Sequence, residues 1–208
     1  MSSLVLDHLY DGDRALFATE LLDRYEEKQS VIVNFLYFAN ATHYRLFEKH
    51  RNAKELAYKQ ALLAGDFLLA DGIALQVYKR TSDLNRVDNL NGTDLTPRLL
   101  DYLTQIYSVS LYVYSAYDEG IDKDTTRLEK GLDGLLRDFP GLRIASSYQS
   151  PYSERGTDFP FEQFERAVAK DDANIKLFLN CTGTPFQEVR VEAHRERFAS
   201  QNMMVLNV

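Results

Sequence analysis

Several features that define common protein classes are scarce or absent in this chain of 208 residues. It contains a single cysteine, Cys181, and no tryptophan. One cysteine excludes an internal disulfide and fits a reducing compartment. Asp and Glu outnumber Lys and Arg by 31 to 24, which gives a net charge of −7. Because a general nucleic-acid binder needs clustered positive charge, we expect no nucleic acid among the partners.

Long apolar runs are missing as well. No segment approaches the roughly 20 apolar residues that a membrane span needs. The first residues, Met1 to His8, lack the basic region and the apolar core of a signal peptide. We therefore expect a cytoplasmic protein. With 45% hydrophobic and 26% charged residues, the composition predicts one globular domain over residues 1–208.

Sequence signatures of several enzyme classes are also absent. The chain has no Gly-x-Gly-x-x-Gly dinucleotide motif, no Gly-Lys-Ser/Thr phosphate loop and no Gly-x-Ser-x-Gly nucleophile motif. Its four histidines lack the paired spacing of a metal site. We expect neither a metal nor a cofactor. Cys181 directly follows a predicted buried strand, which favours a small core residue over a nucleophile.

Predicted strands and helices alternate along the chain. Apolar and β-branched runs predict strands at 31–38, 66–70, 110–115, 142–146, 175–179 and 203–206. Helical spacing predicts helices at 11–27, 41–64 (in two pieces), 72–79, 95–106, 125–139, 161–170 and 187–198. This alternation predicts an α/β fold, a Rossmann-like and mainly parallel sheet with helices on both faces. The polar loop at 148–158 is the best candidate for a mobile flap.

Three polar segments lead out of strands or loops into helices. They are Asp71-Gly72, the stretch Asn91 to Asp94, and the stretch Thr182 to Glu188. Ligands bind at the carboxyl ends of parallel strands, so these segments suggest a single crevice. Asp71 is available there as a general base, although aspartate is also a common helix cap. Free backbone N–H groups at the third segment attract an anion such as a diphosphate. Asn40 follows the first strand and either binds a substrate or caps a helix.

The order of these motifs resembles the WecG/TagA/CpsF glycosyltransferases. The resemblance runs through Asn40, Ala70-Asp71-Gly72, Asn91 to Leu95, Phe139 to Leu142, and Gly183 to Glu188. These bacterial enzymes move a sugar from a nucleotide donor onto a lipid-linked saccharide. The resemblance implies an inverting, metal-independent hexosyltransferase with Asp71 as its catalytic base. It also implies substrate-binding roles for Asn40, Thr42, Gly72, Arg86, Asn89, Gly92, Asp94, Gly183, Gln187 and Glu188.

The partners implied by this resemblance are a nucleotide-sugar donor, a UDP-sugar, and an undecaprenyl-diphosphate-linked saccharide acceptor. The implied process is bacterial cell-wall or exopolysaccharide synthesis. A lipid-linked acceptor requires a cytoplasmic protein to make peripheral contact with the inner face of the plasma membrane.

The chain also departs from the family pattern. Phe186 stands where the family usually has lysine, and Asn89 where it usually has arginine, with Arg86 a few residues earlier. The chain stops after the apolar run ending at Val208, without the family's basic C-terminal appendage. An uncovered apolar strand there would favour a homo-oligomer. Two alternatives stay open: a small α/β hydrolase that uses Asp71 on water, and a catalytically silent protein of the same fold that binds a sugar nucleotide or another protein.

Overall fold

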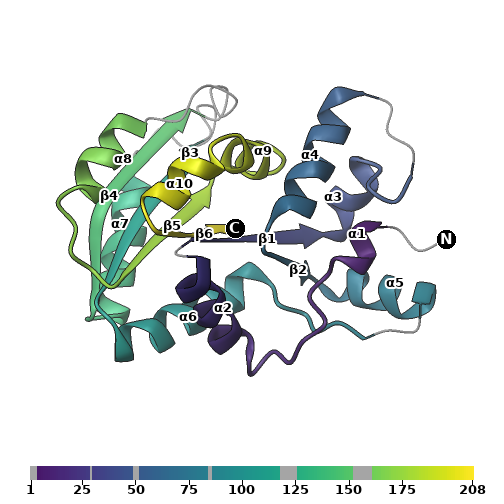
Figure 1. Cartoon of the computed structure of the whole chain (residues 1–208), viewed down its shortest axis with the longest axis horizontal. Helices are drawn as coiled ribbons and strands as arrows, with labels where there is room; N and C mark the ends of the chain where they lie inside the picture. Colours follow the sequence, from purple (N-terminus) through teal and green to yellow (C-terminus); the bar gives the residue numbers. More distant parts are fainter. Residues whose placement is uncertain (1–3, 29, 49–51, 84–85, 118–125, 152–160) are drawn as a thin grey trace.

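A six-stranded sheet forms the centre of the protein (Figure 1). The structure is a computed structural model that describes residues 4–28, 30–48, 52–83, 86–117, 126–151 and 161–208. Every strand pair in this sheet is parallel, and the strand order is β2-β1-β6-β5-β3-β4. The predicted α/β Rossmann-like fold is therefore confirmed. The strands are β1 (Val31–Tyr37), β2 (Phe67–Asp71), β3 (Val109–Tyr117), β4 (Leu142–Pro151), β5 (Ile175–Cys181) and β6 (Met203–Asn207).

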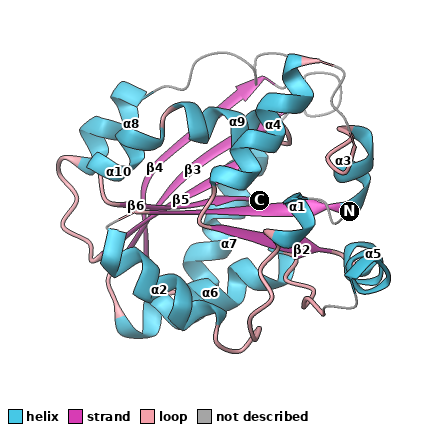
Figure 2. Ribbon diagram, turned by 45° about the vertical axis from the view of Figure 1, so that its right-hand side comes forward, coloured by secondary structure: helices cyan, strands magenta, loops and turns pink. Residues whose placement is uncertain are grey.

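Helices cover both faces of the sheet (Figure 2). The α6 face carries α2 (Phe17–Lys28), α6 (Gly92–Ile106) and α7 (Thr126–Asp138). The α4 face carries α1 (Leu4–Asp7), α4 (Ala53–Ala64), α8 (Phe161–Val168), α9 (Phe186–Ala193) and α10 (Arg195–Ser200). Two further helices, α3 (Phe38–His43) and α5 (Ile73–Asp83), directly follow β1 and β2 at the carboxyl edge of the sheet.

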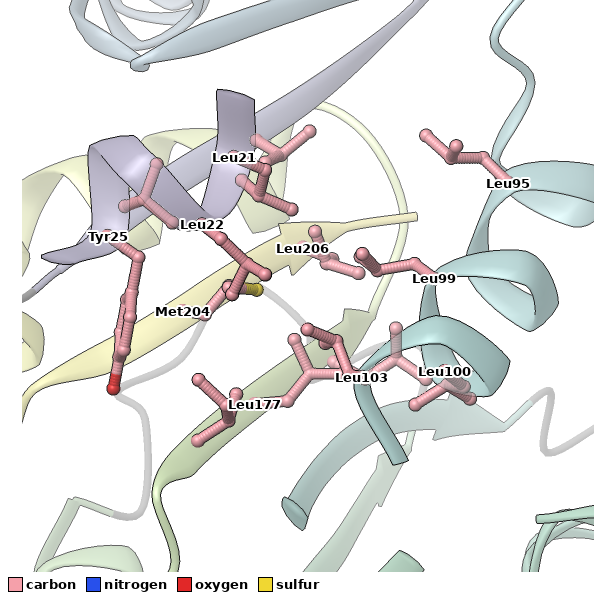
Figure 3. Packing of buried hydrophobic residues seen from close by; sticks show 14 of the residues in the cluster. Leu21, Leu22, Tyr25, Leu95, Leu99, Leu100, Leu103, Leu177, Met204 and Leu206 are labelled. Atoms are coloured by element: carbon pink, nitrogen blue, oxygen red, sulfur yellow. The ribbon is translucent and has the colours of Figure 1, made fainter. Parts of the chain in front are cut away.

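The strands read as apolar runs because both of their faces are buried. In β6, Met204 and Leu206 face the α6 side, whereas Val205 faces the other side, as the two-residue repeat of a strand requires. Figure 3 shows how Leu22 of α2 and Leu99 of α6 close over this part of β6. Burial of such side chains is the dominant favourable contribution to folding.

One row of the sheet breaks the apolar pattern. Asn34 of β1, Asn207 of β6 and Asn180 of β5 stand in register on adjacent strands, each almost fully buried. The Asn207 amide nitrogen donates to the Asn34 side-chain oxygen at 2.7 Å, and the Asn180 amide nitrogen donates to that of Asn207 at 3.1 Å. We call this row the asparagine ladder. It joins three strands through side chains in addition to their backbone hydrogen bonds.

The asparagine ladder also holds helices of the α4 face. Asn34 Nδ2 donates to the carbonyl oxygen of Ala61 in α4, and Asn180 Nδ2 donates to that of Gln187 in α9. Gly65 follows α4, and a Cβ atom added there would lie 2.5 Å from Asn34 Nδ2. A residue with a side chain at position 65 would therefore displace the end of the ladder.

Several predicted boundaries were wrong. α2 begins at Phe17 instead of residue 11, because Asp13 accepts the Ala15 N–H and forms a turn before the helix. α6 begins at Gly92 instead of residue 95, and Pro97 lies inside it. The helix predicted at 187–198 is two helices, α9 and α10, which meet at His194.

The predicted flap at 148–158 is partly a strand. Residues 148–151 extend β4 and pair with β3, and the rest of the segment lies outside the described residues. Residues 148–151 are Tyr, Gln, Ser and Pro, so this end of the edge strand lacks the apolar run that identified the other strands, which explains the error.

The asparagine ladder leads to a stability prediction. We expect Asn207→Ala to lower the free energy of unfolding by about 2–4 kcal/mol, because it leaves the buried Asn34 Oδ1 without its donor and removes one of the two acceptors of Asn180 Nδ2. Urea denaturation would measure this loss. The comparison is Asn91→Ala, which removes the side-chain N-cap of α6 and should lower the free energy of unfolding by about 1 kcal/mol. A smaller loss for Asn207→Ala than for Asn91→Ala would contradict the importance of the ladder.

Candidate active site

Asp71 is the last residue of β2, and its neighbours fix it at the carboxyl edge. Its side chain is half-buried and lies on the α6 side, since Leu69 two residues earlier belongs to the core of that face. The Asp71 carboxylate accepts the backbone N–H of Gly92, the first residue of α6. The next residue, Gly72, has φ +96°, a left-handed conformation that favours glycine.

The segment that leads into α6 runs along the end of β2. Asn89 Oδ1 accepts the Gly72 N–H at 2.7 Å, and the Leu90 N–H donates to the Ala70 carbonyl oxygen at 2.9 Å. Gly92 is buried, and an added Cβ atom would lie 3.3 Å from Val208 Cγ1. These contacts bring four of the predicted residues together: Asp71, Gly72, Asn89 and Gly92.

Electrostatics make Asp71 a stronger base than an ordinary surface aspartate. Burial raises the pKa of its carboxyl group, and the nearby carboxylate of Asp94 raises it further. The hydrogen bond from Gly92 N–H opposes both effects. Asp94 itself is held by Asn91, which accepts its backbone N–H at 2.8 Å and donates to its Oδ2 at 2.9 Å. The raised pKa of Asp71 suits a group that takes up a proton during a reaction.

In the turn at Thr182 to Glu188, backbone N–H groups form hydrogen bonds within the turn itself. The Gly183 N–H donates to Gln187 Oε1 at 3.0 Å, and the backbone N–H groups of Phe186 and Gln187 donate to the Gly183 carbonyl oxygen. The prediction that these N–H groups are free for an anion was therefore wrong. Thr182 Oγ1 donates to Asn180 Oδ1 at 2.9 Å, and this hydrogen bond connects the turn to the asparagine ladder.

Glu188 is buried in the turn and is 1% exposed. Its Oε1 accepts hydrogen bonds from Thr184 Oγ1 at 2.8 Å and from Gln187 Nε2 at 3.2 Å. Burial raises its pKa to about 7, although these hydrogen bonds lower it. The same region includes the buried Tyr58 of α4, whose pKa is raised by burial and by the charge of Glu188. The buried side chains of Gln187 and Glu188 thus form the inside of the turn, and its partly exposed residues are Gly183, Thr184 and Phe186.

A cleft of about 310 Å³ opens where β3, β4 and β5 end beneath α7. Its polar lining is formed by Ser115, Gln149 and Cys181, and α7 adds leucine side chains. Cys181 and Ser115 face the α6 side, as Asp71 does. β5 and β2 are separated by β6 and β1, so about 14 Å of sheet lies between the cleft and Asp71. Burial raises the pKa of the Cys181 thiol to about 12, which keeps it protonated at neutral pH.

Other predicted residues lie farther along the same edge. Asn40 and Thr42 are inside α3, and Thr42 Oγ1 donates to the Ala39 carbonyl oxygen at 2.9 Å. Asn40 is therefore a helical residue, not the cap of α3. Arg86 lines a small pocket of about 180 Å³ at the side of α5, together with Gln76 and Arg80. Of the two positions considered for the family arginine, it is Asn89 that contacts the Asp71-Gly72 pair.

The structure reveals one basic residue that sequence reasoning missed. Lys54 of α4 places its Nζ 5.0 Å from the ring centre of Phe186. Phe186 occupies the position where the family usually has lysine. Lys54 therefore brings an ammonium group back to this position from a different helix. The only sequence signal was the replacement itself, because nothing in the chain indicates which residue lies against Phe186.

Metal ligands do not cluster in the described part of the chain. Within it, no group of three or more His, Cys, Asp or Glu side chains is arranged to hold a metal ion. Asp11-Gly12-Asp13 has the spacing of a metal-binding aspartate pair, but Asp13 Oδ1 accepts the Ala15 N–H at 2.8 Å.

Of the helices in the described ranges, none has both the length and the apolar character needed to cross a membrane.

Comparison with known proteins identifies the family. The sequence profile of the glycosyl transferase WecG/TagA/CpsF family matches residues 8–207 of the chain. The chain therefore belongs to this family, as its motifs indicated, and is a glycosyltransferase of cell-wall polymer synthesis. No curated protein sequence matches it.

The buried Glu188 leads to a pH prediction. Its pKa is about 7 in the folded protein and 4.5 when unperturbed, so the folded state retains a proton that the unfolded state releases between these values. The contribution of Glu188 to stability is present below about pH 4.5 and is lost as the pH rises through 7. We expect Glu188→Gln to gain stability relative to the wild type between pH 5 and pH 8, by an amount on the order of 1–3 kcal/mol.

Urea denaturation of both proteins at the two pH values would measure this difference. Glu196→Gln, an exposed substitution in the neighbouring helix α10, serves as the control and should show no such pH dependence. An unchanged difference between Glu188→Gln and the wild type at both pH values would refute the prediction.

Proposed function

We propose that this protein transfers a sugar from a nucleotide-sugar donor, a UDP-sugar, to an undecaprenyl-diphosphate-linked saccharide. The observation that carries the proposal is the position of Asp71. Its half-buried carboxylate lies at the carboxyl edge of a parallel sheet, is fixed by the Gly92 N–H and has a raised pKa. Ligands of open α/β sheets bind at this edge.

In the proposed reaction Asp71 is the general base. It accepts the proton of an acceptor hydroxyl while that oxygen forms a bond to the anomeric carbon of the donor sugar. The bond between this carbon and the diphosphate oxygen breaks, and the diphosphate leaves with the electron pair. Attack from the side opposite the leaving group inverts the anomeric centre. The charge that develops on the diphosphate is stabilised by fixed donors, without a metal.

The donor is proposed to span the edge from the cleft toward Asp71. The cleft beneath α7 offers apolar walls and the side chains of Ser115 and Gln149 to a nucleoside. Gly183 and Thr184 lie at the end of β5 between the cleft and β2, where a diphosphate would pass. Lys54, which stands over Phe186, supplies a positive charge beside this turn. Asn40 and Asp94, near the end of β2, are proposed to contact the sugar or the acceptor.

The acceptor determines where the protein works. A polyprenyl diphosphate is anchored in the membrane, so we propose peripheral contact at the cytoplasmic face of the bacterial plasma membrane. Association between copies of the chain is proposed to bring several sites to that surface.

The assignment of Asp71 predicts the behaviour of Asp71→Asn. We expect a folded protein whose transfer rate falls by about 10²–10⁴-fold, because the amide cannot accept a proton. Steady-state kinetics with UDP-sugar and a lipid-linked acceptor would measure this. Asp88→Asn, an exposed substitution in the neighbouring segment, is the control and should keep normal activity. For the wild type, the acid limb of kcat/KM should lie above the ordinary aspartate range, since the pKa of Asp71 is raised.

Three results would contradict parts of this proposal. Near-normal transfer by folded Asp71→Asn removes Asp71 as the base. Donor turnover by the wild type at equal rates with and without acceptor indicates a hydrolase. Binding of UDP-sugar by the intact protein without any turnover favours the catalytically silent alternative.

Lys54 gives a second prediction. We expect Lys54→Gln to weaken UDP binding by about tenfold, because it removes a charge beside the proposed path of the diphosphate. Isothermal titration calorimetry with UDP would measure the dissociation constant. Lys59→Gln lies on the same helix, α4, and should leave the constant unchanged. Equal affinities of Lys54→Gln and the wild type would exclude Lys54 from the donor site.

A further inference from the structure

A second cavity, lined by two arginines, lies outside the candidate active site. It has a volume of about 400 Å³ and is bounded by α6, by the start of α2 and by the segment before α2. The two helices run over the same face of the sheet (Figures 1 and 2). Arg14 enters the lining from the segment before α2 and Arg98 from α6. We call it the Arg14–Arg98 cavity. Its volume falls in the range of small-molecule sites.

In the described part of the chain, neither Arg14 nor Arg98 takes part in an ion pair, so both guanidinium groups lack an anionic partner there. Arg14 Nε is shielded from solvent and has no hydrogen-bond acceptor in that part of the chain. A shielded N–H group without an acceptor costs free energy, which a bound acceptor would recover.

Two carboxylates near these arginines along the chain are already engaged. Asp13 also lines the cavity, but its Oδ1 accepts the Ala15 N–H at 2.8 Å. Asp94, one helical turn before Arg98, accepts from Asn91 Nδ2 at 2.9 Å. The lining therefore carries two arginines and one aspartate, a net positive charge in a chain of net charge −7.

Apart from Thr19, the rest of the lining is apolar or aromatic. Leu95, Leu99 and the ring of Tyr102 form one wall, and Ala18 of α2 leaves room opposite them. An inorganic anion alone would leave this wall without contacts. The lining suits a ligand with an anionic end for the guanidinium groups and an apolar or planar body for the leucine and tyrosine side chains.

We infer that the Arg14–Arg98 cavity binds an organic phosphate, a monoester of phosphate or diphosphate with an apolar body. Planar guanidinium groups bind phosphate oxygens through paired N–H donors, which explains two unpaired arginines at one cavity. Arg98 follows Gly92 by six residues, or about 9 Å along α6, so the occupant lies near the Asp71 contact but does not share it. The inference goes beyond the proposed function and does not depend on it. The phosphate belongs either to a free metabolite or to the head group of a lipid.

Calorimetric titration of the full chain tests the inference with two probes. Geranyl diphosphate represents the lipid source, and phenyl phosphate represents a free small-molecule monoester. We expect saturable binding of at least one probe, weakened about tenfold or more by Arg14→Gln and by Arg98→Gln. Arginine-dependent binding of geranyl diphosphate alone assigns a lipid head group, and such binding of phenyl phosphate assigns a free metabolite. Arg24→Gln, an exposed substitution on α2, is the control and should bind like the wild type.

Several outcomes would overturn the inference. One is equal affinity of Arg14→Gln, Arg98→Gln and the wild type, with all three melting at similar temperatures. Another is the lack of saturable binding of either probe at millimolar concentration. A third is binding that is lost in Asp71→Asn but kept in both arginine variants, because the ligand then occupies the candidate active site. That third result would leave the proposed function intact.

Discussion

The carboxyl edge of the sheet depends on the hydrogen bonds of the asparagine ladder. Asn34, Asn207 and Asn180 are buried amides, and each would carry a large desolvation cost if a neighbouring strand slipped in register. Their hydrogen bonds therefore select one register for β1, β6 and β5. The Asn34 and Asn180 amides also donate to backbone carbonyl groups of α4 and α9. These hydrogen bonds fix the two helices at one position along the strands.

This constraint divides the carboxyl edge into two functionally different halves. On the α4 side, the ladder continues through Thr182 into a turn in which Gln187 binds the Gly183 N–H and Glu188 binds the Thr184 hydroxyl. On the α6 side, Asp71 and the cleft beneath α7 remain partly open. The internally bonded turn fixes the backbone of Gly183 and Thr184, whereas the open half provides space for reacting groups. Because the Gly183 N–H is already bound by Gln187, in the proposed reaction the charge on the leaving group is stabilised by other fixed groups, such as Lys54.

The sequence predicted the sheet better than the site. Each strand is a short apolar run between turn residues, and such runs can be recognised from the local sequence alone. The contact of Asp71 with Gly92 was only suggested by proximity to the same edge, since it joins residues on either side of α5. The ladder was missed because one asparagine in an apolar strand carries no local signal. Glu188 was expected in a segment that leads into a helix, with a substrate-binding role, and only the packing of α4 against α9 shows that it is buried.

Unpaired basic side chains are informative in this protein because carboxylates are in excess. With 31 acidic and 24 basic residues, most Lys and Arg side chains have a carboxylate available to them. Surface ion pairs contribute little to the free energy of folding, so those elsewhere in the chain need no separate explanation. The absence of such pairs at Arg14 and Arg98, within the described residues, leaves positive charge concentrated at one cavity. Lys54 likewise lies over the rings of Tyr44 and Phe186. The electrostatic potential inside a cavity is set mainly by the charges closest to it. A cavity lined by basic side chains therefore attracts anions even when the protein as a whole is acidic.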